Sequence, residues 1–534
     1  MQQKNQKIED APNVLKNTAK VGLFTTISRV LGVVREMLQS RLIGAGWEQS
    51  AFTLAFAIPN MARKLFGEGA LTSAFIPVFK DVLKNEGEEA ARKVARSVMS
   101  MALLMLGSLT VLSVLGVSAA FSWYPWGLEV NSEQSERVLL ILKLTRTLLP
   151  YMIFICGAAF GMGIMNALGR FFAAAALPCI LNIIWILSLF VLLFVGDMAI
   201  SQRVQYVAIA ILISGACQMG LMFWCMHKRR MSPKITFKGW RNPHVSLIWR
   251  NTAIGAIGAG AIQINYMLDQ LLAQWAAPWA AGVIGYADRL MDMPLGIIGV
   301  SFGTVLLPTL SGFFSKKDVE GARGVLVSST QKMLFLILPA AAGLAVLAPD
   351  ITRVIYEGNA FDGIATIRVS RATACYSIGL GFFGLQKCIV PWFHAQKDMK
   401  TPLYVSMAMV FFNAILNVTS VLLLPVEWRH VGLAGSTVVC SLITCILLAA
   451  IARRRNGALG FKKIVKPVLQ ILLASAVMCF AIYYMRDFLN EICSAHQWSG
   501  VAKNITTLSV LAAVGAGVYF AVMFLFKKIS SRLK

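Results

Sequence analysis

Long apolar segments recur from one end of the chain to the other, and they constrain its fold more than any other feature. Such runs cover, for example, residues 100–121, 177–195 and 207–224. A helix of about 18 residues or more crosses the roughly 30 Å hydrocarbon core of a bilayer. Only 14% of the residues are charged, against roughly 25% in soluble proteins. We therefore expect an all-α polytopic membrane protein.

The apolar segments indicate about fourteen transmembrane helices. The expected spans are 14–43, 50–80, 96–121, 137–168, 172–195, 203–226, 247–276, 281–311, 322–347, 365–394, 402–424, 431–452, 464–486 and 501–526. The polar start of the chain, followed by Arg29 and Arg35, lacks the order of regions found in a cleaved signal peptide. We expect the first helix to remain in the mature protein.

The connections between these spans alternate in charge. Basic residues gather in 227–243, 311–323, 394–401, 453–466 and 527–534. With fourteen helices these segments share one side, which is the cytoplasm by the positive-inside rule. Both termini are then cytoplasmic in a multi-pass protein of the inner membrane. The net charge of +25 could suggest a nucleic-acid partner. The basic residues lie mostly in short loops between apolar segments, however, and in a membrane protein that pattern indicates orientation in the bilayer. We expect membrane lipids as partners and no nucleic acid.

A weak internal repeat divides the chain. The spacing from Pro77 to Arg92 equals the spacing from Pro308 to Arg323, so the second pair repeats the first further along the chain. The offset between the two pairs spans six helices, which gives both copies the same orientation, as in transporters with parallel repeats. We predict an N-lobe at 1–240, a C-lobe at 241–455, and two additional helices at 456–534. A chance recurrence of these common residues is the alternative.

Charged residues inside the predicted helices are the candidates for function. An arginine at a helix centre costs about 2.5 to 3.5 kcal/mol on the insertion scale, so these side chains should face water, an anion or a partner charge. Arg29, Arg63 and Lys64 lie deepest, whereas Arg35 and Arg289 are near enough to helix ends to reach the surface. The acids beside these cations are Glu36, Glu68, Asp288 and Asp292.

These acids are too few to neutralise all the cations, so a net positive cavity between two lobes is predicted. Arginine binds phosphate with two parallel hydrogen bonds, and an anionic substrate such as a diphosphate would suit the cavity. Salt bridges that join neighbouring helices are the structural alternative. A second candidate site combines Asp269, Asn413 and Asn417 as ligands for a cation, or as bonds between helices.

The sequence lacks the motifs of nucleotide hydrolysis and of common hydrolases. It contains no Walker A segment, no GxSxG and no HExxH. We therefore expect a transporter without cofactors rather than an enzyme. Its energy would come from the membrane potential, from a proton or sodium gradient, or from the substrate gradient.

Several motifs resemble the MurJ (MviN) family of lipid II flippases, within the multidrug/oligosaccharidyl-lipid/polysaccharide exporter superfamily. They are the stretches 28–36, 58–70, 74–77, 286–294 and 303–308. The resemblance implies two six-helix lobes, and two C-terminal helices that form a groove for a lipid tail. It implies alternating access that carries lipid II, the lipid-linked peptidoglycan precursor, to the outer leaflet for cell wall biogenesis and cell shape.

By motif, the essential arginines of that family fall on Arg29, Arg35, Arg63 and Arg289. The chain departs from the family at Ser50 and at Asn417, where relatives carry carboxylates, so the resemblance does not imply sodium coupling. The remaining alternatives are export of another lipid-linked oligosaccharide, a multidrug or organic-cation antiporter, and a membrane scaffold. The antiporter predicts an acidic cavity, and the scaffold predicts fully paired charges.

Overall fold

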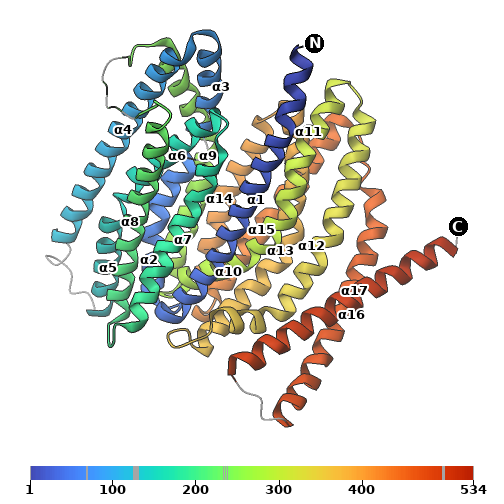
Figure 1. Ribbon diagram of the computed structural model, residues 1–534. Helices are drawn as coiled ribbons and strands as arrows, with labels where there is room; N and C mark the ends of the chain where they lie inside the picture. The colour runs from blue at the N-terminus through green and yellow to red at the C-terminus, as the bar shows by residue number, and fades with distance from the viewer. Residues whose placement is uncertain are drawn as a thin grey trace. The chain divides into compact units, whose positions relative to one another are not determined.

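A computed structural model describes residues 2–67, 70–123, 132–232, 234, 236, 239–495 and 500–532, and these residues are almost entirely helical (Figure 1). Within these ranges there is no β-strand, which confirms the predicted all-α class. Contacts divide the chain into two compact units, one of residues 1–270 with 358–360 and one of residues 271–357 with 361–534. The boundary predicted at residue 240 comes from the sequence repeat and stays a prediction.

The first unit holds the helices up to most of α9. They are α1 (Gln2–Ile43), α2 (Trp47–Ala62), the π-helical turn η1 (Arg63–Gly67), α3 (Ala70–Asn85), α4 (Gly87–Trp123), α5 (Ser132–Leu148), α6 (Tyr151–Ala167), α7 (Phe171–Phe194), α8 (Ile200–His227) and α9 (Pro243–Ala276).

The second unit holds the rest. Its elements are α10 (Ala280–Pro294), the π-helical turn η3 (Leu295–Gly299), α11 (Val300–Ser315), α12 (Val319–Tyr356), α13 (Gly363–Ala395), α14 (Lys400–Leu423), α15 (Val426–Asn456), α16 (Lys462–Ala495) and α17 (Gly500–Arg532).

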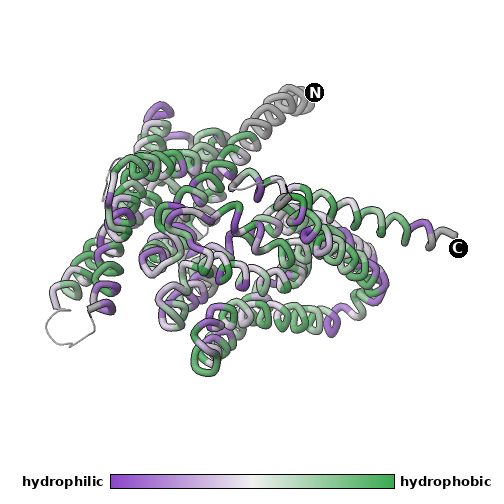
Figure 2. The backbone as a smooth tube through the Cα atoms, turned by 90° about the horizontal axis from the view of Figure 1, so that it is seen from below, coloured by the Kyte–Doolittle hydropathy of each residue, from purple (hydrophilic) through white to green (hydrophobic). Residues whose placement is uncertain are grey.

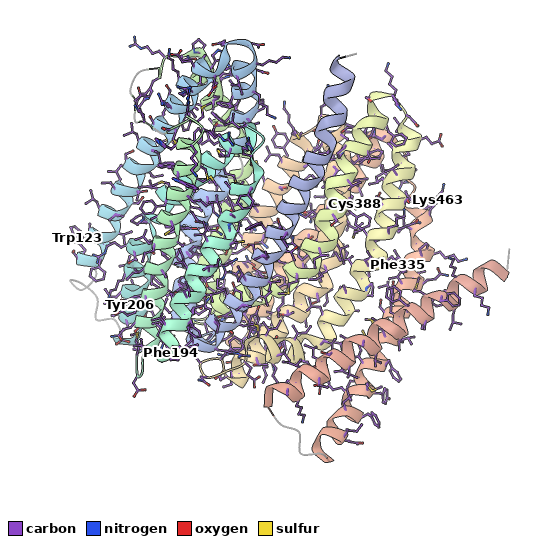
Figure 3. All side chains as sticks on the ribbon, viewed as in Figure 1. Trp123, Phe194, Tyr206, Phe335, Cys388 and Lys463 are labelled. Atoms are coloured by element: carbon purple, nitrogen blue, oxygen red, sulfur yellow. The ribbon has the colours of Figure 1, made fainter. Side chains whose placement is uncertain are left out.

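Many of these helices suit a bilayer. Eleven helical stretches among the described residues are long and apolar enough to cross a membrane. In Figure 2, much of the helical backbone has the green colour of hydrophobic residues. The prediction of a multi-pass membrane protein is confirmed, while the count of fourteen helices stays a prediction. Trp123, Tyr206 and Phe194 are exposed toward one end of the first unit (Figure 3), as aromatic side chains are at membrane interfaces.

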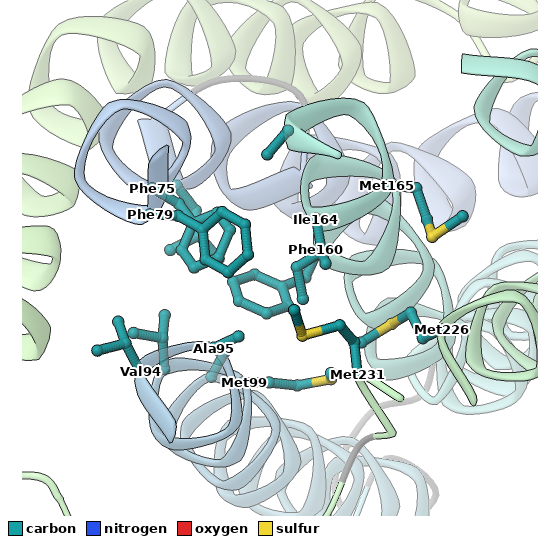
Figure 4. Packing of buried hydrophobic residues seen from close by; sticks show 14 of the residues in the cluster. Phe75, Phe79, Val94, Ala95, Met99, Phe160, Ile164, Met165, Met226 and Met231 are labelled. Atoms are coloured by element: carbon teal, nitrogen blue, oxygen red, sulfur yellow. The ribbon is translucent and has the colours of Figure 1, made fainter. Parts of the chain in front are cut away.

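Close packing of aromatic and thioether side chains holds the first unit together. Phe75 and Phe79 of α3 stack with ring centroids 5.1 Å apart, and Phe75 lies 4.9 Å from Phe160 of α6. Met99 of α4 and Met226 of α8 belong to the same buried cluster (Figure 4). Because lipid tails are as apolar as these side chains, the cluster stabilises the unit through shape and dispersion rather than through exclusion of water.

The two π-helical turns occupy matching places in the chain. η1 begins at Arg63 and η3 begins at Leu295, and the offset between them differs by a single position from the offset between Pro77 and Pro308. Each turn is followed by a helix that contains one of these prolines, Pro77 in α3 and Pro308 in α11. Chance recurrence of single residues does not explain a shared irregularity of the backbone, so the structure supports the repeat.

The turn between α13 and α14 is held by one carboxylate. Asp398 accepts hydrogen bonds from the backbone N–H groups of Lys400 and Thr401, each at 3.0 Å, and from the Thr401 hydroxyl at 2.6 Å. The Arg455 guanidinium lies 2.5 Å from the same side chain. The Thr401 hydrogen bonds, followed by the contact with Arg455, lower the pKa of Asp398 to about 2.

We predict that Asp398→Ala lowers the free energy of unfolding by about 1 kcal/mol, because the start of α14 loses its cap. The lowered pKa means that this stabilisation is present above the ordinary carboxyl pKa of 3.8 and is lost as the pH falls toward 2. Thermal unfolding in detergent should therefore separate the variant from the wild type at neutral pH and bring them together near pH 2. Asp197→Ala, at an exposed position between α7 and α8, is the control.

Candidate functional site

Arg35 of α1 is a buried polar contact between two helices of the first unit. Its guanidinium donates to the Asn182 side-chain oxygen at 2.9 Å, pairs with the adjacent Glu36, and lies 4.4 Å from the ring centroid of Trp185. The side chains of Arg35 and Glu36 are each 11% exposed. These protein groups satisfy the charge of Arg35 inside the first unit. The ion pair lies within α1, and the link to α7 is a hydrogen bond to a neutral amide rather than a salt bridge between helices.

Asn182 is the centre of this contact. This buried residue of α7 also donates from its amide nitrogen to the Ser28 carbonyl oxygen of α1 at 3.0 Å. Ser28 and Arg35 are separated by two turns on one face of a helix. A single amide therefore fixes α1 against α7 over two turns, while Arg29, which follows Ser28, is exposed.

The π-helical turn η1 carries the next two predicted cations. Arg63 is half-buried and donates to the Asn60 side-chain oxygen at 3.1 Å. The Lys64 ammonium lies 5.2 Å from the ring centroid of Tyr266 in α9. Lys64 therefore contacts α9, whereas Arg63 donates to Asn60 of α2, one turn before η1. Glu68, the predicted acid next to them, lies outside the described residues.

The three residues of the predicted cation site belong to different units. Asp269 of α9, in the first unit, accepts from the Asn265 amide at 3.1 Å and lies one turn beyond Tyr266. In the second unit the Asn417 amide of α14 donates to the Asn413 side-chain oxygen at 3.0 Å, and both side chains are buried. Within the described ranges no three His, Cys, Asp or Glu side chains lie close enough to hold a metal ion.

In the second unit, one face of α10 carries charged residues and another face is buried against neighbouring helices. Tyr286 is buried, with its ring 4.7 Å from that of Tyr356. Arg289 and Asp292 are exposed, and Asp288 is half-buried. The structure therefore places Arg289 and Asp292 together, about one turn apart on the exposed face of α10.

An apolar groove lies along the same helix. The cavity, with a volume of about 420 Å³, is formed by α10, α12, α16 and α17. Leu290, Met293 and Pro294 of α10 line it, together with Leu347 of α12 and Ile482 of α16. Met293 follows Arg289 by one helical turn, and such residues lie about 5 to 6 Å apart on one helix face. Arg289, which does not itself line the cavity, thus lies one helical turn from a residue of the apolar groove, within one unit.

Two polar contacts hold the helices that form the groove. The Tyr519 hydroxyl of α17 donates to the Phe335 carbonyl oxygen of α12 at 2.7 Å. Near the far end of α12, Arg486 of α16 donates to the Val346 carbonyl oxygen at 2.8 Å and to Asp350 at 2.5 Å. Residues 335 and 350 are about 22 Å apart along a helix, at about 1.5 Å per residue. The groove runs between these two contacts.

Comparison with known proteins now decides the family. The model of the family described as "Lipid II flippase MurJ" matches residues 39–518. The chain belongs to the MurJ family. A protein of Bdellovibrio bacteriovorus named "Probable lipid II flippase MurJ" is 30% identical over 527 residues, covering 97% of this chain and 95% of the relative. The "Lipid II flippase MurJ" of Burkholderia cenocepacia is 27% identical over 96% of this chain and 97% of that protein.

Solved structures place the fold in the same family. A MurJ flippase in an inward closed conformation matches with a TM-score of 0.73 and 25% identity, covering 95% of this chain and 98% of that one. An inward-facing MATE multidrug transporter matches with a TM-score of 0.66 at 16% identity, covering 82% of this chain and 96% of that one. The latter shares the superfamily fold. The predicted MurJ resemblance and the prediction of a transporter are confirmed.

Sequence reasoning missed the partners of Arg35 and the two polar contacts that hold the helices of the groove. Asn182 and Trp185 lie in an apolar run, and Arg486 and Tyr519 lie in the two last helices. The single amide in the apolar run was a usable signal, because an unpaired amide in hydrocarbon is costly. Which helix it would bond to depended on the tertiary structure.

We predict that Asn182→Ala lowers the free energy of unfolding by about 1 to 3 kcal/mol, since it removes the hydrogen bonds that join the half-buried Ser28 and Arg35 of α1 to α7. Thermal unfolding of the purified protein is the measurement. Ser188→Ala is the control on the same helix, because the Ser188 hydroxyl bonds only one turn back, to the Trp185 carbonyl oxygen. Equal stability of the two variants would contradict the assigned role of Asn182.

Proposed function

We propose that this chain is a lipid II flippase. It carries the lipid-linked peptidoglycan precursor from the inner to the outer leaflet by alternating access and so supports cell wall biogenesis. Membership of the MurJ family supports this function. Lipid II itself is the substrate that the names of the relatives give for them.

The observation that carries the proposal is the position of Arg289 beside the apolar groove. A lipid-linked diphosphate is an anion joined to a long hydrocarbon chain, and it needs a cationic donor next to an apolar surface. Arg289 is exposed one helical turn from Met293, which lines the groove. A guanidinium donates two parallel hydrogen bonds to a phosphate, while the groove between α12, α16 and α17 receives the hydrocarbon.

The first unit supplies further cations for the same substrate. Arg29 is exposed, and Arg63 and Lys64 are half-buried at the π-helical turn. We assign substrate contact to Arg29, Arg63 and Arg289, with Lys64, Asp288 and Asp292 beside them. Arg35, paired with Glu36, positions α1. A multidrug antiporter with an acidic cavity fits this set of residues less well, and the MATE likeness is one of fold.

The orientation follows from the basic turns. In the second unit Lys316 and Lys317 lie between α11 and α12, Lys397 lies between α13 and α14, and Arg453 to Arg455 form the last turn of α15. Because the helices alternate in direction, these positions fall at the same end of the unit. We propose that this end is cytoplasmic, as are both termini, and that the protein resides in the inner membrane. The Asn413–Asn417 pair is uncharged, so we assign no ion to it, and we propose that the membrane potential or an ion gradient supplies the energy.

The two π-helical turns supply the bending that alternating access needs. A π-turn interrupts the regular i to i−4 hydrogen bonds and often marks a functional site. η1 starts at the substrate-contacting Arg63, and η3 starts directly after the groove residue Pro294. We propose that both turns act as hinges, one in each repeat.

Depletion of this protein from cells should lower the amount of lipid II that is accessible at the outer leaflet, while total lipid II is kept or rises. Labelling of the precursor by a reagent confined to the outside of the cell measures this quantity. The proposal predicts that wild-type protein restores the signal and that an empty vector does not. An unchanged outer-leaflet signal after depletion would exclude the flippase function.

Arg29→Ala should abolish transport without loss of folded protein, since the phosphate loses a charged donor. Arg29→Lys should restore it only in part, because an ammonium cannot make the two parallel hydrogen bonds. The outer-leaflet assay in depleted cells, with membrane protein levels measured alongside, tests both variants. Arg137→Ala, a residue of α5 that pairs with Glu133 one turn away, is the control.

Gly296→Ala should slow transport several-fold by favouring regular α-helix at the η3 hinge, where alanine is about 1 kcal/mol better than glycine. A Cβ atom at Gly296 would meet nothing within 4 Å, so the change adds no clash. Gly312 of α11 is equally open but lies outside the hinge, which makes Gly312→Ala the matched control. Wild-type transport by Gly296→Ala would rule out the hinge.

A further inference from the structure

A second cavity lies in the second unit, at the end of the α12–α13 hairpin away from the basic turns. Its volume is about 590 Å³. It is lined by Pro349 and Arg353 of α12 and by Asp362, Ile364, Ile367 and Arg371 at the start of α13. None of these residues lines the apolar groove or belongs to the substrate-contacting set, so the proposed function does not account for this cavity.

The charges that line the cavity are unequal. Arg353 and Arg371 are cationic, and Asp362 is the single acid among the lining residues. The Asp362 carboxylate caps α13 by accepting from the Ala365 backbone N–H at 2.7 Å. Glu357, outside the lining, is 3.4 Å from Arg353 and accepts from the Thr366 hydroxyl at 2.9 Å. Glu357 thus matches Arg353, and Asp362 is engaged as the cap of α13, so Arg371 is the lining cation that no carboxylate of the described residues pairs with. It lies near the N-terminal end of a long helix, which favours anions.

The cavity lies at the level of lipid head groups. α13 has 33 residues and is about 50 Å long at about 1.5 Å per residue, which exceeds the roughly 30 Å hydrocarbon core. Arg371 lies just over two turns into α13, or about 12 Å from that end. A centred helix therefore places Arg371 close to the boundary between hydrocarbon and head groups.

The residues around Arg371 suit an amphiphile. The Arg371 guanidinium lies 4.6 Å from the ring centroid of Trp428 in α15, which keeps it extended toward the boundary. Ile364 and Ile367 are 57% and 52% exposed and lie on the same face of α13 as Arg371. A phosphate at Arg371 would thus be continuous with an apolar surface that can hold an acyl chain.

From these observations we infer that the cavity binds the phosphate of an anionic phospholipid, with Arg371 and Arg353 as its ligands and Ile364 and Ile367 under the acyl chain. A head group with one negative charge matches the one cation that no carboxylate pairs with, Arg371, so phosphatidylglycerol is the class of ligand to which we commit. This bound lipid lies in the leaflet opposite the basic turns. The inference does not rest on the transported substrate.

The neighbouring Arg368 serves as the control for Arg371. Comparing the two residues distinguishes a specific lipid site from the general preference of arginine for the membrane interface. It lies about one turn before Arg371 on the same helix, is 3.7 Å from the ring centroid of Trp279, and pairs with Glu427 at 3.3 Å. It does not line the cavity. Both arginines have an aromatic partner at a similar depth, and only one of them faces the proposed phosphate.

The test is native mass spectrometry of the full-length protein in detergent, titrated with short-chain phosphatidylglycerol, phosphatidylethanolamine or phosphatidylcholine. We expect one phosphatidylglycerol to bind with clear preference over the two zwitterionic lipids. Arg371→Gln should weaken that binding about tenfold, as expected for loss of one charged hydrogen-bonding partner. Arg371→Lys should weaken it less, and Arg368→Gln should leave it unchanged.

A second variant keeps the test decisive if Arg371→Gln does not fold. Ile367→Glu places a negative charge at an exposed position of the cavity floor and should repel phosphatidylglycerol while leaving phosphatidylethanolamine binding little changed. The inference is overturned if the three lipids bind alike, or if Arg368→Gln weakens phosphatidylglycerol binding as much as Arg371→Gln. It is also overturned if neither Arg371→Gln nor Ile367→Glu has an effect.

Discussion

The cost of placing a charge or an unbonded polar group in hydrocarbon governs this structure. At about 2.5 to 3.5 kcal/mol for each central arginine, such a residue persists only if it has a partner, water or an anion within reach. The described helices meet that requirement in two ways. Some cations, such as Arg35 and Arg486, are bound by side chains and carbonyl oxygens of neighbouring helices. Others, such as Arg29 and Arg289, are exposed on their helices.

Polar contacts between helices take over the role that burial of apolar surface has in water, because lipid gives little drive for apolar surfaces to associate. Asn182 joins α1 to α7, and Tyr519 and Arg486 join α17 and α16 to α12. The last two define the length of the apolar groove. The contacts that stabilise the second unit therefore also shape the apolar groove that we propose for a hydrocarbon chain.

We propose that the repeat underlies the transport mechanism as well as the architecture. Both copies contain a π-helical turn, and each turn adjoins a residue assigned to the substrate, Arg63 in one copy and the groove residue Pro294 in the other. A hinge placed next to its ligand allows binding and bending to influence each other, since the ligand shifts the equilibrium only as far as it prefers one shape. The lipid cavity at Arg371 lies on a different hairpin and adds a contact with the surrounding bilayer.

The sequence by itself determined the all-α membrane class, the repeat, the MurJ resemblance and the identity of the unusual charges. These follow from composition, periodicity and motif, which are local along the chain. Only the tertiary structure decided that Arg35 is bound by Asn182 and Trp185, that an apolar groove begins one helical turn from Arg289, and that the predicted cation ligands Asp269 and Asn417 belong to separate units. The physical reason is that each charge can be satisfied by several partners of similar energy, and the packing of distant helices selects among them.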